Sequence, residues 1–230
     1  MDGREFLMAL DKLVDSAQLD VDLTAVANAI RAKTGGNGSL IFPSGFIGAI
    51  ENIPGEWTTA GFAAGTEPSG NIVIPSSSLV PLFYGFSAIT RVVAPYLTQA
   101  KANQFRSMSA LTTIIAQEMT TFASACIMNN AHLTVMDLKG GDTLGTNAFG
   151  SNTRLTTVIF RNTSTIQSAS QSNMFDGSKS TAKPIHVYVP NALKATYEAA
   201  ANWSTWAADG TVIFDALEGS AYEQTDWWMS

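Results

Sequence analysis

The chain of 230 residues has little charge, one cysteine and two histidines. Charged residues make up 14% of the sequence and hydrophobic residues 46%, whereas soluble domains commonly have about 25% charged residues. Such a chain can bury a core and can also hide much of its surface in an assembly. No basic cluster of the kind that follows a phosphate backbone occurs along the sequence, so we expect no nucleic-acid partner.

The shortage of reactive side chains argues against an enzyme. A single cysteine, Cys126, excludes an internal disulfide and a multi-cysteine zinc site. Neither His132 nor His186 has a metal-binding side chain at ligand spacing, and the sequence has no G-x-S-x-G motif. The acidic residues of the central region suggest no glycosidase pair. We therefore expect no catalytic residues, no metal and no cofactor.

Long apolar runs are missing as well. No stretch approaches the roughly 18 apolar residues of a membrane span, so we expect no membrane insertion. The first residues, MDGREFLMALDKLVD, have mixed charge and lack the apolar core of a signal peptide. We expect a protein that is made in the cytoplasm and is not secreted by the usual route.

What is present is a repeat of 22 residues. The segments FRSMSALTTIIA and FGSNTRLTTVIF are nearly the same and lie 44 residues apart, with a third copy halfway between them. Four positions of the unit recur in one register without a gap. They are Phe83, Phe105, Ile127 and Phe149; Ile89, Leu111, Leu133 and Leu155; Thr90, Thr112, Thr134 and Thr156; and Val92, Ile114, Met136 and Val158. A fixed period of this length indicates a solenoid.

Each repeat contains the same order of residue types. A short β-rich run such as TTVIF suits a strand, polar residues follow, and an apolar residue then anchors the unit. Cys126 falls at an apolar position of the repeat, so we expect it to be inert core. Strand-then-proline segments at residues 71–75 and 185–190 extend the array, the second after an irregular stretch at 168–184.

The repeats resemble leucine-rich repeats of the BspA-like kind. AITRVVAPYLTQAKANQF and IVIPSSSLVPLFYGFSAIT follow that pattern well, although most units lack its glycine and only three strands end in proline. The resemblance implies an α+β fold: short N-terminal helices, a leucine-rich-repeat-like solenoid with short parallel strands, and a C-terminal helical cap. It says little about function, because this scaffold serves many binding roles.

The N-terminal block LDVDLTAVANAIRAKTGGNGSLIFPSGFIGAIENI reads as a capped helix, a glycine-rich turn and a short second helix. It resembles a small module of structural proteins from phages of Gram-positive bacteria, where it commonly links an attachment segment to a distal domain. Ahead of it, EFLMALDKLVDSAQ predicts an amphipathic helix with Phe6, Leu10 and Leu13 on one face. This helix either docks on its own domain or serves as an attachment or oligomerisation helix.

The C-terminal region resembles the end cap that follows BspA-like repeats. NALKATYEAAANWSTWAA predicts a helix with Leu193, Tyr197, Ala200 and Trp203 toward the core, and TVIF at residues 211–214 predicts a last strand. A solenoid needs such a cap because its last unit would otherwise expose the core. Trp227 and Trp228 near the end are either docked on the chain itself or held by a partner.

The strand register also predicts which residues point outward. They form a candidate interface, which we call the outer row: Val73, Arg91, Val93, Thr113, Ile115, Val135, Asp137, Thr157, Ile159, His186 and Tyr188. Its apolar members make a stripe that Asp137 interrupts, and contiguous apolar surface marks an interaction site when it is exposed. The chain's own ends, a sister subunit or virion neighbour, or a sugar ligand could each cover it.

Together these patterns predict three regions: an N-terminal helical attachment module at residues 1–56, a solenoid at 57–182, and a last strand, capping helix and tail at 183–230. The function we expect is a non-enzymatic structural or adhesive component of a phage virion (tail fibre, baseplate or capsid surface) with host-receptor binding. Expected partners are other virion proteins, sister subunits and a host-surface polysaccharide or protein. One alternative is a bacterial surface adhesin, and another is a carbohydrate-binding module of a wall-degrading phage enzyme. We expect the virion location to follow assembly in the host cytoplasm and release by lysis.

Overall fold

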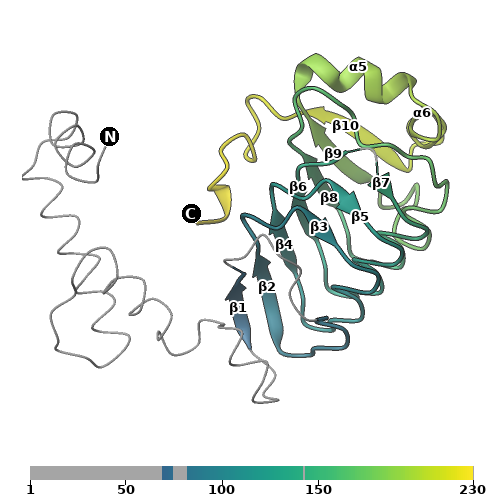
Figure 1. The fold of residues 1–230 in the computed structure, drawn as a ribbon. Helices are drawn as coiled ribbons and strands as arrows, with labels where there is room; N and C mark the ends of the chain where they lie inside the picture. Colours follow the sequence, from purple (N-terminus) through teal and green to yellow (C-terminus); the bar gives the residue numbers. More distant parts are fainter. Residues whose placement is uncertain (1–68, 75–81, 142, 230) are drawn as a thin grey trace, which may run out of the picture. The chain divides into compact units, whose positions relative to one another are not determined.

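The computed structural model describes residues 69–74, 82–141 and 143–229. The chain divides into two compact units, Met1–Thr58 and Thr59–Ser230, and all described residues belong to the second. Within that unit the chain winds into a parallel β-solenoid of about four turns, closed at its C-terminal end by two short helices (Figure 1). The predicted N-terminal helices, with Phe6, Leu10 and Leu13, lie outside the described residues.

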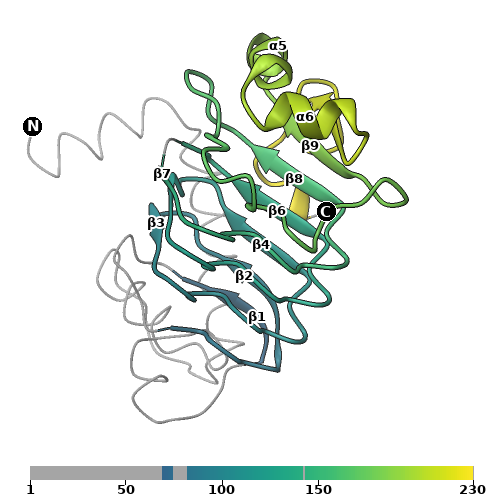
Figure 2. The ribbon, with the colours of Figure 1, turned by 90° about the vertical axis from the view of Figure 1, so that its right-hand side faces the viewer.

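Two parallel sheets line the coils of the solenoid. The main sheet has the order β1-β2-β4-β6-β8-β9-β10 and the small sheet the order β3-β5-β7 (Figure 2). The main-sheet strands are β1 (Gly70–Val73), β2 (Ile89–Val93), β4 (Thr113–Ala116), β6 (Val135–Leu138), β8 (Thr157–Phe160), β9 (Ile185–Val189) and β10 (Val212–Ala216). The small-sheet strands are β3 (Gln99–Ala100), β5 (Thr121–Phe122) and β7 (Thr143–Leu144).

The strand register confirms the repeat. Thr113 pairs with Val135 and Val135 with Thr157, so from β2 to β8 neighbours in the sheet are residues 22 positions apart. The same spacing relates the strands of the small sheet, where Gln99 pairs with Thr121. Each coil therefore stacks on the next without lateral shift, and equivalent side chains lie above one another.

The predicted columns fill the interior. Ile89, Leu111, Leu133 and Leu155 are fully buried, as are Phe83, Phe105, Ile127 and Phe149. The inward strand residues are buried too: Val92, Ala94, Ile114, Ala116, Met136, Leu138, Val158 and Phe160. Every coil contributes one residue to each column, so burial of a given residue depends on the coil above and the coil below.

A buried polar ladder runs beside the apolar columns. The side-chain oxygen of Asn152 accepts a hydrogen bond from the Asn130 amide at 2.9 Å, and its side-chain nitrogen donates to the carbonyls of Ile127 and Phe149 at 2.8 Å. The Ser178 hydroxyl continues the ladder by accepting from the Asn152 amide at 2.8 Å. These contacts satisfy backbone groups at a sharp corner that lies inside the protein.

The same corners place two columns of residues in the left-handed backbone region. One column contains Asn103, Ala125 and Asn147, with φ of 60°, 55° and 54°. The other contains Gly85, Ser107, Asn129, Ser151 and Gly177. Asparagine and glycine tolerate this conformation better than other residues, which explains their recurrence at the corners.

The stretch at residues 168–184, expected to be irregular, continues the stack as a longer coil. The Phe149 amide donates to the Met174 carbonyl at 3.0 Å, and the rings of Phe149 and Phe175 lie 5.7 Å apart. Ser178 takes the place that follows Asn152 in the ladder after 26 residues rather than 22. The four additional residues of this coil therefore break the 22-residue period in the sequence, but the coil still stacks on the one before it.

The cap consists of α5 (Asn191–Ala199), α6 (Trp203–Ala208) and strand β10. The single predicted helix is thus interrupted, because Ala200 has an extended backbone with ψ of 152° and Asn202 has φ of 64°. Tyr197 and Trp203 are fully buried as predicted. Both rings reach the last coil, since the Tyr197 hydroxyl accepts from the Gln167 amide at 2.7 Å and the Trp203 indole donates to the Gln167 carbonyl at 2.8 Å.

Candidate functional site: the outer strand face and the C-terminal strap

The outer row does not form an open apolar surface. Val73 is 38% exposed, but Val93, Ile115 and Ile159 are buried. The other members are buried or half-buried: Arg91, Thr113, Val135, Asp137, Thr157, His186 and Tyr188. Of the apolar stripe, only Val73 is exposed, so most of the stripe is covered, which is one of the alternatives that the sequence left open.

Part of the cover comes from the chain's own C-terminal end. After β10 the chain turns back and runs along the outer side of the main sheet (Figure 1). We call residues 222–228 the C-terminal strap. They form irregular turns that lead into a 3-10 helix, η1 (Trp227–Met229). The strap brings Tyr222 to β9 and Trp227 to β6.

Asp137, on β6, is the centre of the contact. Its side chain is 0% exposed, and a charge buried this deeply needs both a counter-charge and hydrogen bonds. Arg161 supplies two parallel bonds, from Nε to Oδ1 at 2.7 Å and from Nη2 to Oδ2 at 2.8 Å. Gln117 donates to Oδ2 at 2.8 Å, and the Trp227 indole donates to the same oxygen at 2.7 Å. Asp137, which interrupts the apolar stripe, is thus the main polar group that holds the strap.

The strap is also held by its backbone carbonyls. Arg161 donates to the carbonyls of Tyr222, Glu223 and Gln224 at 2.9–3.2 Å. The Gln117 side chain donates to the Thr225 carbonyl at 2.8 Å. Arg91 donates to the Trp228 carbonyl at 3.2 Å.

Aromatic rings complete the docking. Tyr222 lies between Tyr188 on β9 and Trp227, with ring centroids 4.8 Å and 5.0 Å away and edge-to-face geometry in both pairs. Burial raises the pKa of Tyr188, and the nearby Asp215 carboxylate and Tyr222 raise it further. Tyr188 is therefore a neutral hydroxyl at physiological pH, and its ring serves as a packing surface.

His186 and Asp215 lie beside this contact on β9 and β10. His186 Nδ1 is 2.8 Å from Asp215 Oδ2, and both side chains are partly exposed. In the register of the two strands Ile213 lies opposite His186 and Asp215 opposite Tyr188, so the contact between His186 and Asp215 runs diagonally between β9 and β10. It is a partly exposed contact between neighbouring strands, and polar contacts of this kind contribute little to stability.

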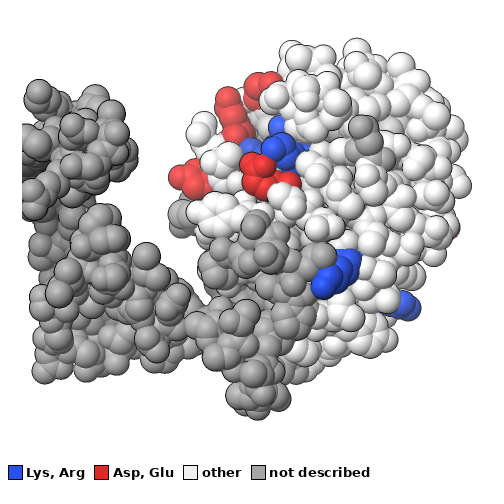
Figure 3. Space-filling model, in the orientation of Figure 1, with Lys and Arg blue, Asp and Glu red and all other residues white. Residues whose placement is uncertain are grey.

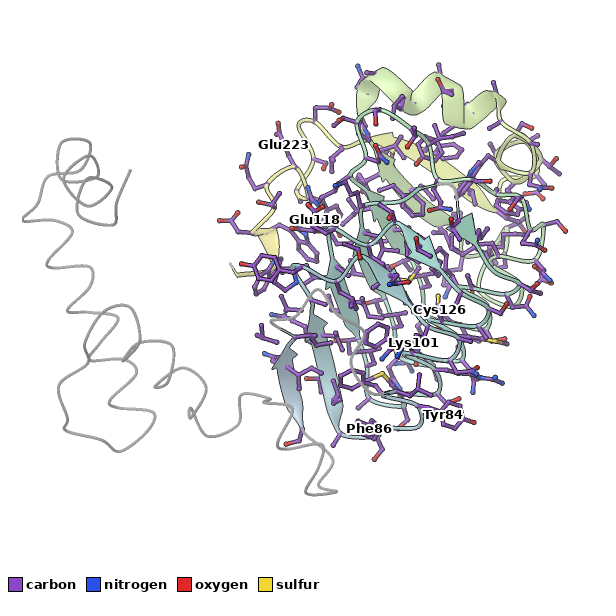
Figure 4. All side chains as sticks on the ribbon, in the orientation of Figure 1. Tyr84, Phe86, Lys101, Glu118, Cys126 and Glu223 are labelled. Atoms are coloured by element: carbon purple, nitrogen blue, oxygen red, sulfur yellow. The ribbon has the colours of Figure 1, made fainter. Side chains whose placement is uncertain are left out.

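Charge is unevenly spread over the face that carries the strap. Acidic and basic side chains gather around the strap and the adjoining coil ends, while the flank of the coils is largely uncharged (Figure 3). Glu118 and Glu223 lie on the strap side (Figure 4). Glu118 pairs there with Lys139 at 2.6 Å on the exposed surface.

Other candidate groups do not join this region. Cys126 is buried as expected, and desolvation raises the pKa of its thiol to about 12, which keeps the thiol protonated at physiological pH. His132 lies in an exposed turn where its ring contacts the Ser109 carbonyl at 2.7 Å. Within residues 69–229, apart from 75–81 and 142, no three potential metal-ligating side chains come together. In the same part of the chain, no helix has the length and apolarity needed to cross a bilayer.

The sequence predictions included five of the residues in these contacts: Arg91, Asp137, Tyr188, Trp227 and Trp228. They missed Arg161, Gln117 and Tyr222. Arg161 and Gln117 follow the strands β8 and β4 directly, so a signal was present in the two long polar side chains at equivalent coil positions.

Comparisons with protein-family models, with curated proteins and with solved structures give no significant match to the chain.

Proposed function

We propose that the chain is a non-enzymatic structural and adhesive component of a bacteriophage virion, with host-receptor binding as its role on the tail or capsid. The observation that carries this proposal is the resemblance of LTAVANAIRAKTG…FPSGF, at residues 23–46, to the linking module of phage structural proteins. In that role the N-terminal region attaches the protein, and the solenoid is the displayed part.

The parallel β-solenoid supports a display role. Its coils repeat the same corners and strands, so it offers a long and regular side surface. Among the described residues the exposed aromatics include Tyr84 and Tyr96, both more than half exposed. In the finer classification that we propose, the coils are leucine-rich repeats of the BspA-like kind, with Ile89, Leu111, Leu133 and Leu155 as the recurring apolar residues.

The direct test is mass spectrometry of purified phage particles, followed by negative-stain imaging with an antibody against the solenoid. We expect the chain in intact particles and the label at one defined position. Particles that contain every other virion protein but not this chain would overturn the proposal.

A second experiment separates the receptor-binding role from a purely structural one. Purified full-length protein is added to host cells before phage, and adsorption is measured. A receptor-binding protein reduces adsorption in proportion to its concentration, and a variant with Tyr84 and Tyr96 changed to Ser tests whether these exposed rings contribute. Unchanged adsorption with a particle-borne protein would leave a structural role and remove the adhesive one.

The two alternatives predict other outcomes. A bacterial BspA-like adhesin would be recovered from the cell-surface fraction of uninfected bacteria rather than from particles. A carbohydrate-binding module of a wall-degrading enzyme would be retained on purified wall polysaccharide and would copurify with a lytic activity.

A further inference from the structure

The contacts between the strap and the main sheet have the character of a peptide bound to a receptor. The sheet side supplies Arg91, Gln117, Asp137, Arg161 and Tyr188. The strap side supplies five backbone carbonyls and two aromatic rings.

We propose that the outer strand face around Asp137 is a peptide-binding site, that its ligand is the C-terminal strap of this chain, and that the bound strap locks the coils of the solenoid together. This goes beyond the proposed virion role and does not depend on it.

The receptor half of the site consists of residues from the coils alone. With the strap in place Asp137 is fully buried, and it is held by Arg161 through two charge-assisted bonds and by Gln117 through a third. All three residues come from coils of the solenoid, on β6 or directly after β8 and β4. The Trp227 indole adds a fourth bond to a carboxylate whose position the other three already fix. A site positioned in this way needs little reorganisation to accept its ligand.

The recognition divides into a general and a specific part. Carbonyl bonds from Arg161, Gln117 and Arg91 recognise main chain and therefore accept any sequence. The bond from the Trp227 indole to a buried carboxylate and the ring of Tyr222 against Tyr188 select the side chains. The expected ligand class is a short peptide with a tyrosine followed five residues later by a tryptophan.

The location of the site gives the strap a mechanical role. In a solenoid each coil contacts mainly its two neighbours, so stability is a sum of neighbour terms and the ends can open separately. The strap touches Tyr188 on β9, Asp137 on β6 and Arg91 on β2 at once. It therefore couples coils that are not neighbours, and opening of one end must first break contacts with the strap.

The neighbouring tryptophans give a matched test in the full-length chain. Trp227→Phe keeps an aromatic ring but removes the indole bond to Asp137, whereas Trp228→Phe removes a bond to the Thr225 carbonyl within the strap itself. Chymotrypsin cleavage of the strap under native conditions measures the open population. Loss of a hydrogen bond to a charged group should raise cleavage by Trp227→Phe roughly tenfold or more, and Trp228→Phe should stay near the parent rate.

The same variants are followed by hydrogen exchange. We expect Trp227→Phe to lower amide protection in β2 and β4 as well as in the strap, because the lock is released along the stack. Equal strap cleavage in Trp227→Phe and Trp228→Phe would overturn the site, and increased strap cleavage with unchanged protection in β2 and β4 would overturn the locking role.

Binding is measured directly with a chain that ends at Ala221 and the labelled synthetic peptide YEQTDWWMS, which corresponds to residues 222–230. We expect saturable binding with one peptide per chain and recovery of protection in β2 and β4. The peptide with Trp227→Phe should bind roughly tenfold to a hundredfold more weakly than the peptide with Trp228→Phe. A folded truncated chain that fails to bind the peptide would refute the proposal, and the full-length test decides if the truncated chain does not fold.

Discussion

Replacement of Asn152 by alanine tests how the corners of the solenoid are held. Asn152 is fully buried, and its side chain bonds the Asn130 amide, the Ile127 carbonyl and the Phe149 carbonyl at 2.8–2.9 Å. Alanine removes all three bonds, and the site has no contact with solvent. The cost therefore comes from buried backbone groups that lose their partner, not only from the lost bonds themselves.

The magnitude follows from those groups. The Phe149 carbonyl keeps a second donor, the Ser178 hydroxyl at 2.9 Å. The Asn130 amide and the Ile127 carbonyl lose the Asn152 side chain, and each buried group left without a partner costs about 1–3 kcal/mol. We expect Asn152→Ala to lower the free energy of unfolding by about 2–6 kcal/mol, a large share of the roughly 5–15 kcal/mol that stabilises a typical domain.

Urea unfolding followed by far-UV circular dichroism measures this change, and thermal unfolding should show a fall in Tm of roughly 2–4 °C for each kcal/mol. Thr156→Ala is the matched control, since it removes one half-buried side-chain bond of 3.4 Å to the Thr134 carbonyl and should cost about 0.5 kcal/mol. If Asn152→Ala were as stable as Thr156→Ala, the polar ladder would carry no net stabilisation and the reasoning would fail.

Three further changes have defined outcomes. Gly145→Ala should destabilise by about 3 kcal/mol in urea titrations, because its Cβ would lie 2.2 Å from the Ser124 backbone nitrogen; a stable variant would show that these coils can separate. Ala125→Gly should raise the free energy of unfolding by up to about 1 kcal/mol, because Ala125 has φ of 55° and glycine adopts this left-handed conformation without strain. A lower Tm for this variant would show that the backbone at Ala125 is not strained. Cys126 should resist iodoacetamide at pH 8 in the folded protein and react in urea, and rapid native labelling would disprove its burial. Because the thiol pKa rises from 9.0 to about 12 on folding, the stability from Cys126 should be complete below pH 9 and be lost as the pH rises toward 12, as pH-dependent unfolding can check.

The main sheet could be predicted because a solenoid repeats one burial pattern. A buried column needs an apolar residue in every coil, so Leu111, Leu133 and Leu155 recur at a constant interval and reveal the register. The small sheet was harder to predict. Its strands are two residues long and are defined by backbone pairing, which leaves little trace in the side chains beyond one apolar position, such as Phe122.

The last coil could not be predicted from the 22-residue period because it is longer than the others. Met174 and Phe175 occupy the interior, but four additional residues shift them out of the 22-residue register. Because a corner on the surface can absorb extra residues while the ladder from Asn152 to Ser178 is kept, the structure tolerates an irregularity that a search for a fixed period does not.

For the candidate site, the alternation of residues along each strand predicted which side chains point away from the core, but not whether another segment covers them. Strand geometry alone makes Ile115 and Ile159 point away from the core, as expected for the outer row. Whether something lies over them depends on contacts between distant segments, such as the bond from Trp227 to Asp137, 90 positions apart. Bonds from Arg161 to main-chain carbonyls leave no pattern in the strap sequence, since every residue has a carbonyl.

The two ends of the strap contact also relate the length of the tail to the number of repeat units in the solenoid. Its two extreme contacts, Tyr188 on β9 and Arg91 on β2, are four rungs apart in the main sheet, or about 19 Å at the usual spacing of neighbouring strands. Duplication of one unit between them would lengthen that span by about 4.8 Å, while the tail would keep its length. A longer descendant of this protein would therefore need a longer tail, and tail length and number of units should change together.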